Sequence, residues 1–370
     1  GCDNTLDKPI FIVEGFDPLN EFFTTSTQVQ THLNLFGLTS FKDTMLNKGY
    51  DIIILNFDDG GDLIENNSAV FRTLVNQINA QKSGNFESIV IGASMGGIIA
   101  RKVLAEMEDD GVPHNAGLYI SFDAPHRGAY VPVGIQQLAL LADAASLGLA
   151  SALDDPLTMI NAPAAKQMLV HYKGKGPDPL FNQLQSNLNA LGYPDQLRKI
   201  TLINGSNIGT NQGYGPGAKI LEWHQFSNIM RIEADAWALP TAVQKTAKLK
   251  MEFNAPIFGW VTVFDVEFQN SYQQSYEWAP GGRLNTQKQV ANAINSLTAI
   301  QIPISFPCLG TKAVVIGGIT FIVPAIVTCT ITITIFDPDP ANTQNRDFHC
   351  FVPSISAVDL APSFSTDLFT

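Results

Sequence analysis

The sequence predicts an α/β fold: a mostly parallel sheet flanked by helices, with a helical cap and an antiparallel β-rich insertion. Two observations carry this prediction. Short β-branched runs alternate with helical patterns over the first third of the chain, as in a parallel sheet covered on both faces. Later, a charge-poor helical stretch is followed by a long stretch rich in Thr, Val and Ile.

The predicted parallel sheet consists of short apolar runs joined by helical crossovers. Within one crossover Ile64, Val70, Leu74 and Ile78 recur at helical spacing. The strands are predicted at Pro9–Glu14, Asp51–Phe57, Ser88–Ile91, Gly117–Phe122 and Ile200–Ile203. The helices are predicted at about 27–48, Leu63–Ala80, Gly97–Glu108 and Leu180–Leu191.

The rest of the chain does not follow this alternation. Val131–Leu153 carries a single charge, Asp143, and is apolar on more than one face, so it is either buried or a mobile cover over something apolar. We therefore predict five segments. They are core residues 1–130, a helical cap or lid at 131–192, a core strand and loop at 193–212, the β-rich insertion at 213–336 and a C-terminal core segment at 337–370.

One part of the insertion is long enough to cross a bilayer. Ala313–Phe336 contains no charged residue. Threonines nevertheless alternate with apolar residues from Thr328 to Ile335, which is the period of a half-buried strand, and Pro324 interrupts the rest. We predict two or three strands here and no integral membrane span.

Composition and charge limit the partners. With 15% charged and 45% hydrophobic residues, the 370-residue chain is predicted to be globular rather than disordered or coiled-coil. Its 22 basic and 34 acidic residues give a net charge of -12, which would repel phosphates. Nucleic acid and anionic bilayers are therefore disfavoured as partners.

The cysteines help to predict where the protein is located in or outside the cell. There are four: Cys2, Cys308, Cys329 and Cys350. They show neither a Cys-x-x-Cys pair nor a matching histidine spacing, which argues against structural zinc. They fit two disulfides, with Cys308 and Cys329 stapling a hairpin, or four buried thiols. Gly1-Cys2-Asp3 fits an internal fragment boundary or the remnant of a lipoprotein cleavage site. We predict a secreted or cell-surface protein, exported by a bacterium, whose signal peptide is not part of this sequence.

A Gly-x-Ser-x-Gly motif, Gly92-Ala93-Ser94-Met95-Gly96, lies between an apolar strand and a helix. A serine at such a turn has a strained backbone and an exposed hydroxyl, and the glycines avoid collisions with neighbouring elements. The N-terminus of the following helix would stabilise negative charge there. The motif predicts that Ser94 is a catalytic nucleophile; a tight turn with a hydroxyl cap is the alternative.

At these residues the chain resembles the α/β-hydrolase superfamily of serine esterases and lipases, over roughly residues 8–130 and the tail. Val13-Glu14-Gly15-Phe16-Asp17 is similar to the loop where bacterial lipases have His-Gly, and Ser121–Ala129 is similar to their Thr-Pro-His-Arg-Gly block. Glu14 and Ala93 stand where lipases have histidine, which favours a general esterase. The resemblance implies an α/β-hydrolase fold with an oxyanion hole made by the backbone N–H groups of Phe16 and Met95.

The resemblance also implies a base and an acid. In the family the base comes last in the chain, which points to His349; His126, in the lipase-like block, is the alternative. The usual place of the acid, after the strand at Ile200–Ile203, holds no carboxylate. Asp123 matches a minority pattern in which the acid ends the preceding strand. The alternative acids are Asp337, Asp339 and Asp347.

We therefore expect a carboxylic-ester hydrolase that uses a Ser-His-Asp triad and an acyl-enzyme on a hydrophobic, lipid-like or polyester substrate. A serine peptidase or acyltransferase on the same fold, or a non-catalytic binding module, are the alternatives. No cofactor or metal is predicted, because the acidic turns at 58–62 and 337–339 lack the calcium-loop pattern and fit solvated turns. The remaining histidines are expected at the surface or in the core: His32, His114, His171 and His224.

Overall fold

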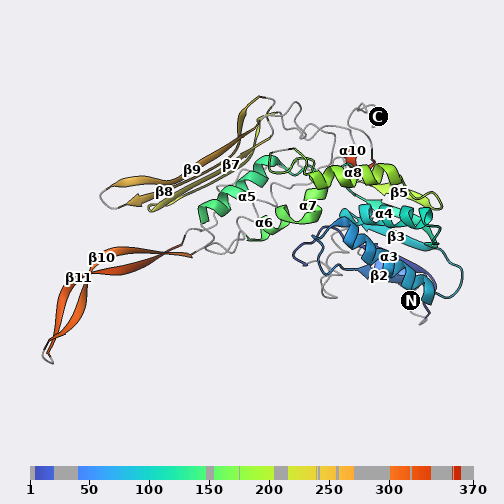
Figure 1. The fold of residues 1–370 in the computed structure, drawn as a ribbon, viewed down its shortest axis with the longest axis horizontal. Helices are drawn as coiled ribbons and strands as arrows, with labels where there is room; N and C mark the ends of the chain where they lie inside the picture. Colours follow the sequence, from blue (N-terminus) through green and yellow to red (C-terminus); the bar gives the residue numbers. More distant parts are fainter. Residues whose placement is uncertain are drawn as a thin grey trace.

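The structure is a computed structural model. It describes residues 5–20, 41–146, 154–174, 176–203, 216–238, 240, 242–255, 258–270, 301–316, 319–334, 352 and 354–359. These residues form a parallel sheet with its helices, a four-stranded antiparallel sheet and a two-stranded hairpin. In Figure 1 the two sheets lie at opposite ends of the main body, and the hairpin extends away from the parallel sheet.

Five parallel strands form the first sheet, in the order β2-β1-β3-β4-β5. They are β1 (Pro9–Val13), β2 (Asp51–Leu55), β3 (Ser88–Ala93), β4 (Ala116–Phe122) and β5 (Arg198–Leu202). All five residues of β1 are buried, as expected for a strand with both faces covered. The predicted parallel sheet is confirmed, with each strand close to its predicted position.

Helices cover both faces of this sheet. They are α2 (Phe41–Asn47), α3 (Ile64–Gln81), α4 (Met95–Asp109) and α8 (Pro179–Leu191). Phe41 of α2 packs near Ile10 and Ile12, whereas α3, α4 and α8 pack in the layer that contains Phe11 and Val13. Because successive residues of a strand point to opposite faces, β1 contributes side chains to both layers of the core.

Three further helices connect the two sheets: α5 (Val133–Ser146), α6 (Asp154–Asn161) and α7 (Pro163–Met168). α5 buries Leu138 and Leu141 against the antiparallel sheet, so these residues are core rather than a mobile cover. α7 instead buries Ala164 and Met168 in the core of the parallel sheet. The segment predicted as one cap is therefore shared between two hydrophobic cores.

The β-rich insertion contains an antiparallel sheet, as predicted. Its strands are β6 (Lys219–Phe226), β7 (Met230–Trp237), β8 (Gln244–Ala255) and β9 (Gly259–Asn270), in that order across the sheet. One face packs on α5 through Trp223, Ala234 and Leu249. The other face carries ion pairs such as Lys248 with Glu233, whose Nζ and Oε2 atoms are 3.0 Å apart. The alternation that predicted the strands thus separates a core face from a charged face.

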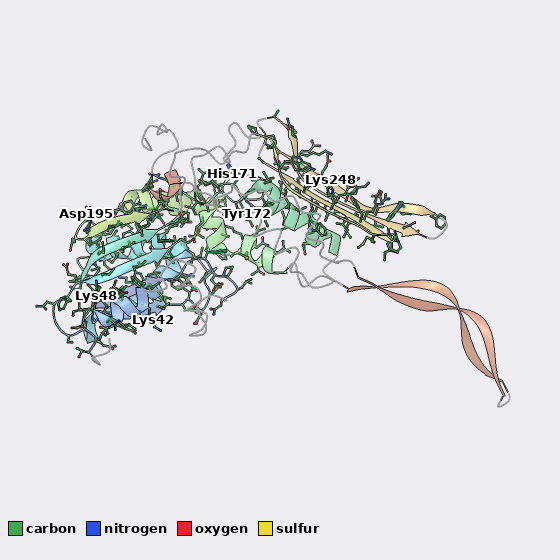
Figure 2. The ribbon with its side chains drawn as sticks, turned by 180° about the vertical axis from the view of Figure 1, so that it is seen from behind. Lys42, Lys48, His171, Tyr172, Asp195 and Lys248 are labelled. Atoms are coloured by element: carbon green, nitrogen blue, oxygen red, sulfur yellow. The ribbon has the colours of Figure 1, made fainter. Side chains whose placement is uncertain are left out.

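Buried hydrogen bonds join α5 to both neighbouring parts. Gln136 donates to the carbonyl oxygen of His171 at 2.8 Å and accepts from the N–H of Lys173 at 2.9 Å. Gln137 accepts from the Thr246 hydroxyl on β8 at 2.6 Å. In Figure 2, His171 lies between the parallel-sheet part and the antiparallel sheet. Since unpaired buried polar groups are costly, these bonds fix how the insertion is attached.

The third sheet is a hairpin of β10 (Gln301–Ile316) and β11 (Ile319–Thr334). This agrees with the prediction of strands, and among the described helices none is long and apolar enough to cross a membrane. Cys308 pairs with Val327, and Cys329 pairs with Phe306. Such diagonal positions are about 7–8 Å apart, wider than the roughly 4.4–6.8 Å between the Cα atoms of a disulfide. Whether Cys308 and Cys329 form the hairpin staple or remain thiols stays open.

Candidate active site

Ser94 connects β3 to α4 in a strained backbone conformation. Its φ of 51° and ψ of -124° lie in a region that costs a residue other than glycine about 1–3 kcal/mol. Its N–H donates to the carbonyl oxygen of Phe122 at 2.8 Å, and its own carbonyl accepts from the N–H of Gly97 at 3.0 Å. Ser94 is the N-cap of α4, but its hydroxyl makes no capping hydrogen bond. The hydroxyl-cap alternative is therefore wrong.

The glycines around Ser94 are required by close packing. A Cβ at Gly92 would lie 2.4 Å from the carbonyl oxygen of Gly96, and a Cβ at Gly96 would lie 2.3 Å from that of Val13. A Cβ at Gly97 would lie 2.4 Å from the Cβ of Ala124. The motif thus lets β3, α4 and the end of β1 approach closely enough to hold the turn.

The loop after β1 lies beside the serine. A Cβ at Gly15 would be 3.3 Å from the Cβ of Ser94 and 3.9 Å from its Oγ. Met95 is the first residue of α4, so the helix N-terminus and the Gly15–Phe16 loop both lie next to the Ser94 side chain. The role of the Phe16 and Met95 N–H groups as oxyanion donors stays a prediction.

Glu14, the residue before Gly15, is a buried carboxyl that is only 1% exposed. Its Oε2 accepts from the N–H of Phe57 at 2.8 Å. Burial raises the pKa of Glu14 to about 7; nearby Asp17 adds to the rise, and the bond from Phe57 opposes it. In the sequence, Glu14 is recognisable only as a departure from the lipase pattern. The structure makes it a titratable group in the loop beside Ser94.

Asp123 lies at the same edge of the sheet as Ser94. It directly follows β4 with a φ of 48°, and its N–H donates to the carbonyl oxygen of Leu202 at 2.7 Å. In the register of β3 and β4, Ala93 is the partner of Phe122. Ser94 and Asp123 are therefore the residues that follow two adjacent parallel strands, where ligands of open α/β sheets bind. Its role as the triad acid stays a prediction.

His126 holds a structural position. Its Nε2 lies 2.9 Å from the Oγ of Ser121 on β4, and the side chain is buried. Burial, followed by the charges of Arg101 and Arg127, lowers the pKa of His126 to about 3. A general base works best with a pKa near the operating pH. These properties favour a structural role for His126 and leave His349 as the candidate base.

The C-terminal segment docks against the block that contains His126. The remaining candidate residues, His349, Asp337, Asp339 and Asp347, lie outside the described residues. The Ser356 hydroxyl accepts from the N–H of Arg127 at 3.0 Å and donates to the carbonyl oxygen of Gly128 at 2.7 Å. Asp359 forms ion pairs with Arg101, at 3.1 Å, and with Arg127. The short helix α10 (Ser354–Ala357) is thus packed against Arg127 and Gly128, and its Ser356 and Ala357 are buried.

His114 and the first acidic turn have structural partners, and His171 is buried. His114 contacts Glu108 at 3.1 Å and accepts from the N–H of Ala116 at 2.9 Å. Glu108 is near the C-terminus of α4 and Ala116 begins β4, so His114 lies at the end of the sheet opposite Ser94. Burial lowers the pKa of His171 to about 4. Asp59 accepts from the N–H of Gly61 at 2.8 Å, a turn hydrogen bond. His32 lies outside the described residues.

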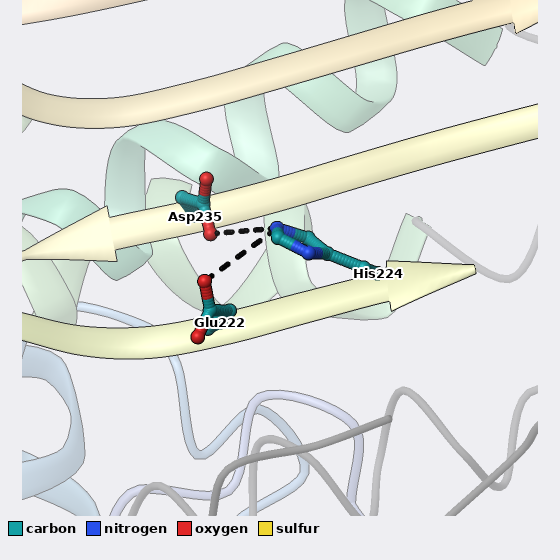
Figure 3. A group of neighbouring side chains, drawn as sticks. All are labelled: Glu222, His224 and Asp235. Carbon is teal, nitrogen blue, oxygen red and sulfur yellow. Dashed lines mark hydrogen bonds and ion pairs between the residues drawn. The ribbon is translucent and has the colours of Figure 1, made fainter. Parts of the chain in front are cut away.

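One cluster of possible metal ligands was missed in the sequence. Glu222, His224 and Asp235 each direct a ligand atom to a common region, and these atoms all lie within 4.8 Å of one another (Figure 3). The sequence signal is Glu-x-His within a strand, which places both side chains on one face. The third ligand comes from the neighbouring strand, and sequence alone does not give that register.

No protein-family model and no curated protein matches the chain. Similar solved structures include a hyperthermophilic esterase from Pyrobaculum calidifontis, with 11% identity and a TM-score of 0.26 over 54% of this chain and 67% of that one. Esterase B from Lactobacillus rhamnosis has 16% identity and a TM-score of 0.24, over 54% and 65%. A lipase-esterase related protein from Clostridium acetobutylicum has 13% identity and a TM-score of 0.26, over 51% and 72%.

The fold is identified by the chain's own geometry. The strands are parallel, helices cover both faces, and a serine with positive φ joins β3 to the N-terminus of α4. The residue after the next strand is an aspartate at the same edge. This arrangement is the α/β-hydrolase fold, here extended by an antiparallel sheet and a hairpin.

Proposed function

We propose that this protein is a serine carboxylic-ester hydrolase with Ser94 as its nucleophile. The main supporting observation is the strained turn at Ser94, which lies beside the Gly15 loop and at the N-terminus of α4. A strained backbone persists only where the surrounding structure holds it, and such sites are commonly functional. The hydroxyl of this serine is not used for helix capping.

In the proposed mechanism, Ser94 Oγ attacks the ester carbonyl while His349 takes its proton. The negative charge on the carbonyl oxygen is stabilised by the N–H groups of Phe16 and Met95 and by the N-terminus of α4. His349 then protonates the leaving alcohol, and an acyl-enzyme remains on Ser94. Water, deprotonated by His349, attacks the acyl carbonyl; the acid leaves as the proton returns from His349 to Ser94 Oγ, and Asp123 holds the histidine in the required tautomer throughout.

Two observations support the choice of base and acid. The residues that follow His349 in the chain, Ser356 and Asp359, bond to Arg127 and Gly128, a few positions after Asp123. His126, the competing base, is already paired with Ser121 in the core. We therefore retain His349 as base and Asp123 as acid, with Asp337, Asp339 and Asp347 as the alternative acids.

The proposed substrate is a hydrophobic ester. Apolar side chains next to the Gly15 loop support this choice: Phe16, Val131 and Tyr172 are partly buried around Ala162 and Leu169. The apolar residues of α5 do not, because they pack on the antiparallel sheet. A chain-length series of p-nitrophenyl esters is expected to show rising kcat/KM from acetate upward, because each buried methylene contributes about 0.8 kcal/mol. An optimum at acetate would contradict the hydrophobic-substrate proposal.

The nucleophile is tested by labelling with a fluorophosphonate probe and by hydrolysis of p-nitrophenyl butyrate. Wild-type protein should be labelled once, and Ser94→Ala should lose the label and roughly 10^4-fold or more of the activity. Ser227→Ala, which changes an exposed serine in the turn between β6 and β7, is the control and should behave as wild type. Labelling that persists in Ser94→Ala would remove Ser94 as the nucleophile.

Two alternatives have distinct outcomes in the same assays. A peptidase or acyltransferase would be labelled but would cleave peptides or transfer the acyl group to an acceptor other than water. A binding module on a hydrolase scaffold would show neither labelling nor turnover.

We also propose export from the cell, on the basis of the acidic composition and the four cysteines. Detection of the protein in the growth medium or at the cell surface tests this.

A further inference from the structure

The outward face of the antiparallel sheet brings three different ligand types together. Glu222 and His224 are two residues apart on β6, and Asp235 on β7 is the direct cross-strand partner of Glu222. His224 Nε2 lies 3.1 Å from Asp235 Oδ1 and 3.9 Å from Glu222 Oε1 (Figure 3). The three donor atoms thus converge from two hydrogen-bonded strands.

The same carboxylates already attract a cation. Lys219 Nζ lies 2.7 Å from Glu222 Oε1 and 3.2 Å from Asp235 Oδ1. The Asp235 side chain is only 8% exposed, so one of the two carboxylates is largely removed from solvent. The cluster therefore has the local negative potential that a metal ion requires.

The scaffold around these residues is rigid and leaves a place for the lysine. Trp223 and Ala234, on the other face of β6 and β7, pack in the core under α5, so the two strands are fixed relative to one another. Lys219 Nζ lies 5.4 Å from the centre of the Trp237 ring, and the Lys219 side chain is 30% exposed. A metal ion can therefore displace Lys219 from the carboxylates into solvent, without leaving its charge in an apolar environment.

We propose that Glu222, His224 and Asp235 form a binding site for a divalent transition-metal ion, with Zn²⁺ as the type case. One imidazole nitrogen and two carboxylate oxygens suit Zn²⁺ and Co²⁺, whereas Mg²⁺ and Ca²⁺ prefer oxygen ligands alone. Three protein ligands leave a coordination position for water. The site lies on the face of the sheet opposite α5, and the ion would link β6 to β7.

Metal titration of the whole purified protein, after treatment with a chelator, tests this site. Wild-type protein should bind Zn²⁺ at this site and give tetrahedral Co²⁺ absorption bands. Because even outer partners of a ligand change metal affinity by about 10- to 100-fold, His224→Gln and Glu222→Gln should weaken binding by more than about 100-fold. Lys219→Met should strengthen it, because the competing ammonium is removed.

Glu267→Gln is the matched control. Glu267 is a carboxylate of β9 in the same sheet, and it pairs with Lys245 rather than with the cluster. This variant should bind Zn²⁺ as wild type does. Circular dichroism and thermal unfolding without metal show whether each variant is folded. Failure of folded wild-type protein to bind Zn²⁺, or equal affinity in folded His224→Gln or Glu222→Gln, would overturn the proposal.

Discussion

The N–H of Ser94 donates to the carbonyl oxygen of Phe122 at 2.8 Å, across the ends of two adjacent parallel strands. The next residue, Asp123, is bonded in the same way to Leu202 at the end of β5. Ser94 and Asp123 both have positive φ, 51° and 48°. The end of each strand is thus tied to its neighbour, and the two residues that leave the sheet do so in conformations that need this support.

Relief of strain at Ser94 should be measurable in stability. Gly→Ala changes at unstrained positions stabilise a protein by about 0.4–1 kcal/mol. At position 94 the order should reverse, because glycine adopts this backbone conformation without penalty and alanine does not. We expect Ser94→Gly to be more stable than Ser94→Ala by about 1 kcal/mol or more in urea unfolding. An alanine variant that is the more stable of the two would mean that the turn is not strained.

Comparing the activities of Asp→Asn variants distinguishes the acid of the triad from aspartates with a structural role. Asparagine tolerates positive φ, so Asp123→Asn should keep the fold. It should lower kcat by up to about 10^4-fold, because the histidine would lose its orienting carboxylate. Asp195→Asn, at an exposed position, should have no effect. If Asp123→Asn is active and Asp347→Asn is not, the acid lies in the C-terminal segment.

Two glycines beside the serine should respond differently to alanine. At Gly15 the added Cβ would be 3.3 Å from the Cβ of Ser94, a crowded but tolerable contact, so we expect folded protein with reduced kcat. At Gly96 the added Cβ would be 2.3 Å from the carbonyl oxygen of Val13, and the turn could not form. Gly96→Ala should therefore lose stability as well as activity. Equal thermal stability of the two variants would contradict this packing.

The sequence was most informative where local pattern alone decides structure. Gly92 and Gly96 predicted the turn because the motif, the strand before it and the helix after it are contiguous in the chain. The partner of His126 could not be predicted, because it depends on how the chain returns after β4. For α5 the apolar pattern predicted burial but not which of the two sheets would bury it.

The buried carboxyl of Glu14 should make stability depend on pH. In the folded protein its pKa is about 7, against 4.5 ordinarily, so the folded state keeps the proton that the unfolded chain releases. Stability from this group is complete below pH 4.5 and is lost as pH rises through 7, by roughly 3 kcal/mol. Relative to Glu14→Gln, wild-type protein should therefore lose about that much unfolding free energy between pH 4.5 and 8. The exposed Glu87→Gln is the control, and an unchanged difference across this range would refute the assignment.

The ion pairs of Asp359 should anchor the segment that follows His349. Asp359 is 13% exposed and pairs with Arg101, whose side chain is 3% exposed, and with Arg127. Removing one partner of a buried pair typically costs about 3–5 kcal/mol, so Asp359→Asn should lower the unfolding free energy by an amount of this order. If His349 is the base, kcat should fall too, because its segment would lose an attachment to the block after Asp123. The matched control is Asp110→Asn, which breaks the exposed pair with Arg72 and should cost no more than about 1 kcal/mol. Equal costs for the two variants would show that Asp359 does not anchor the segment.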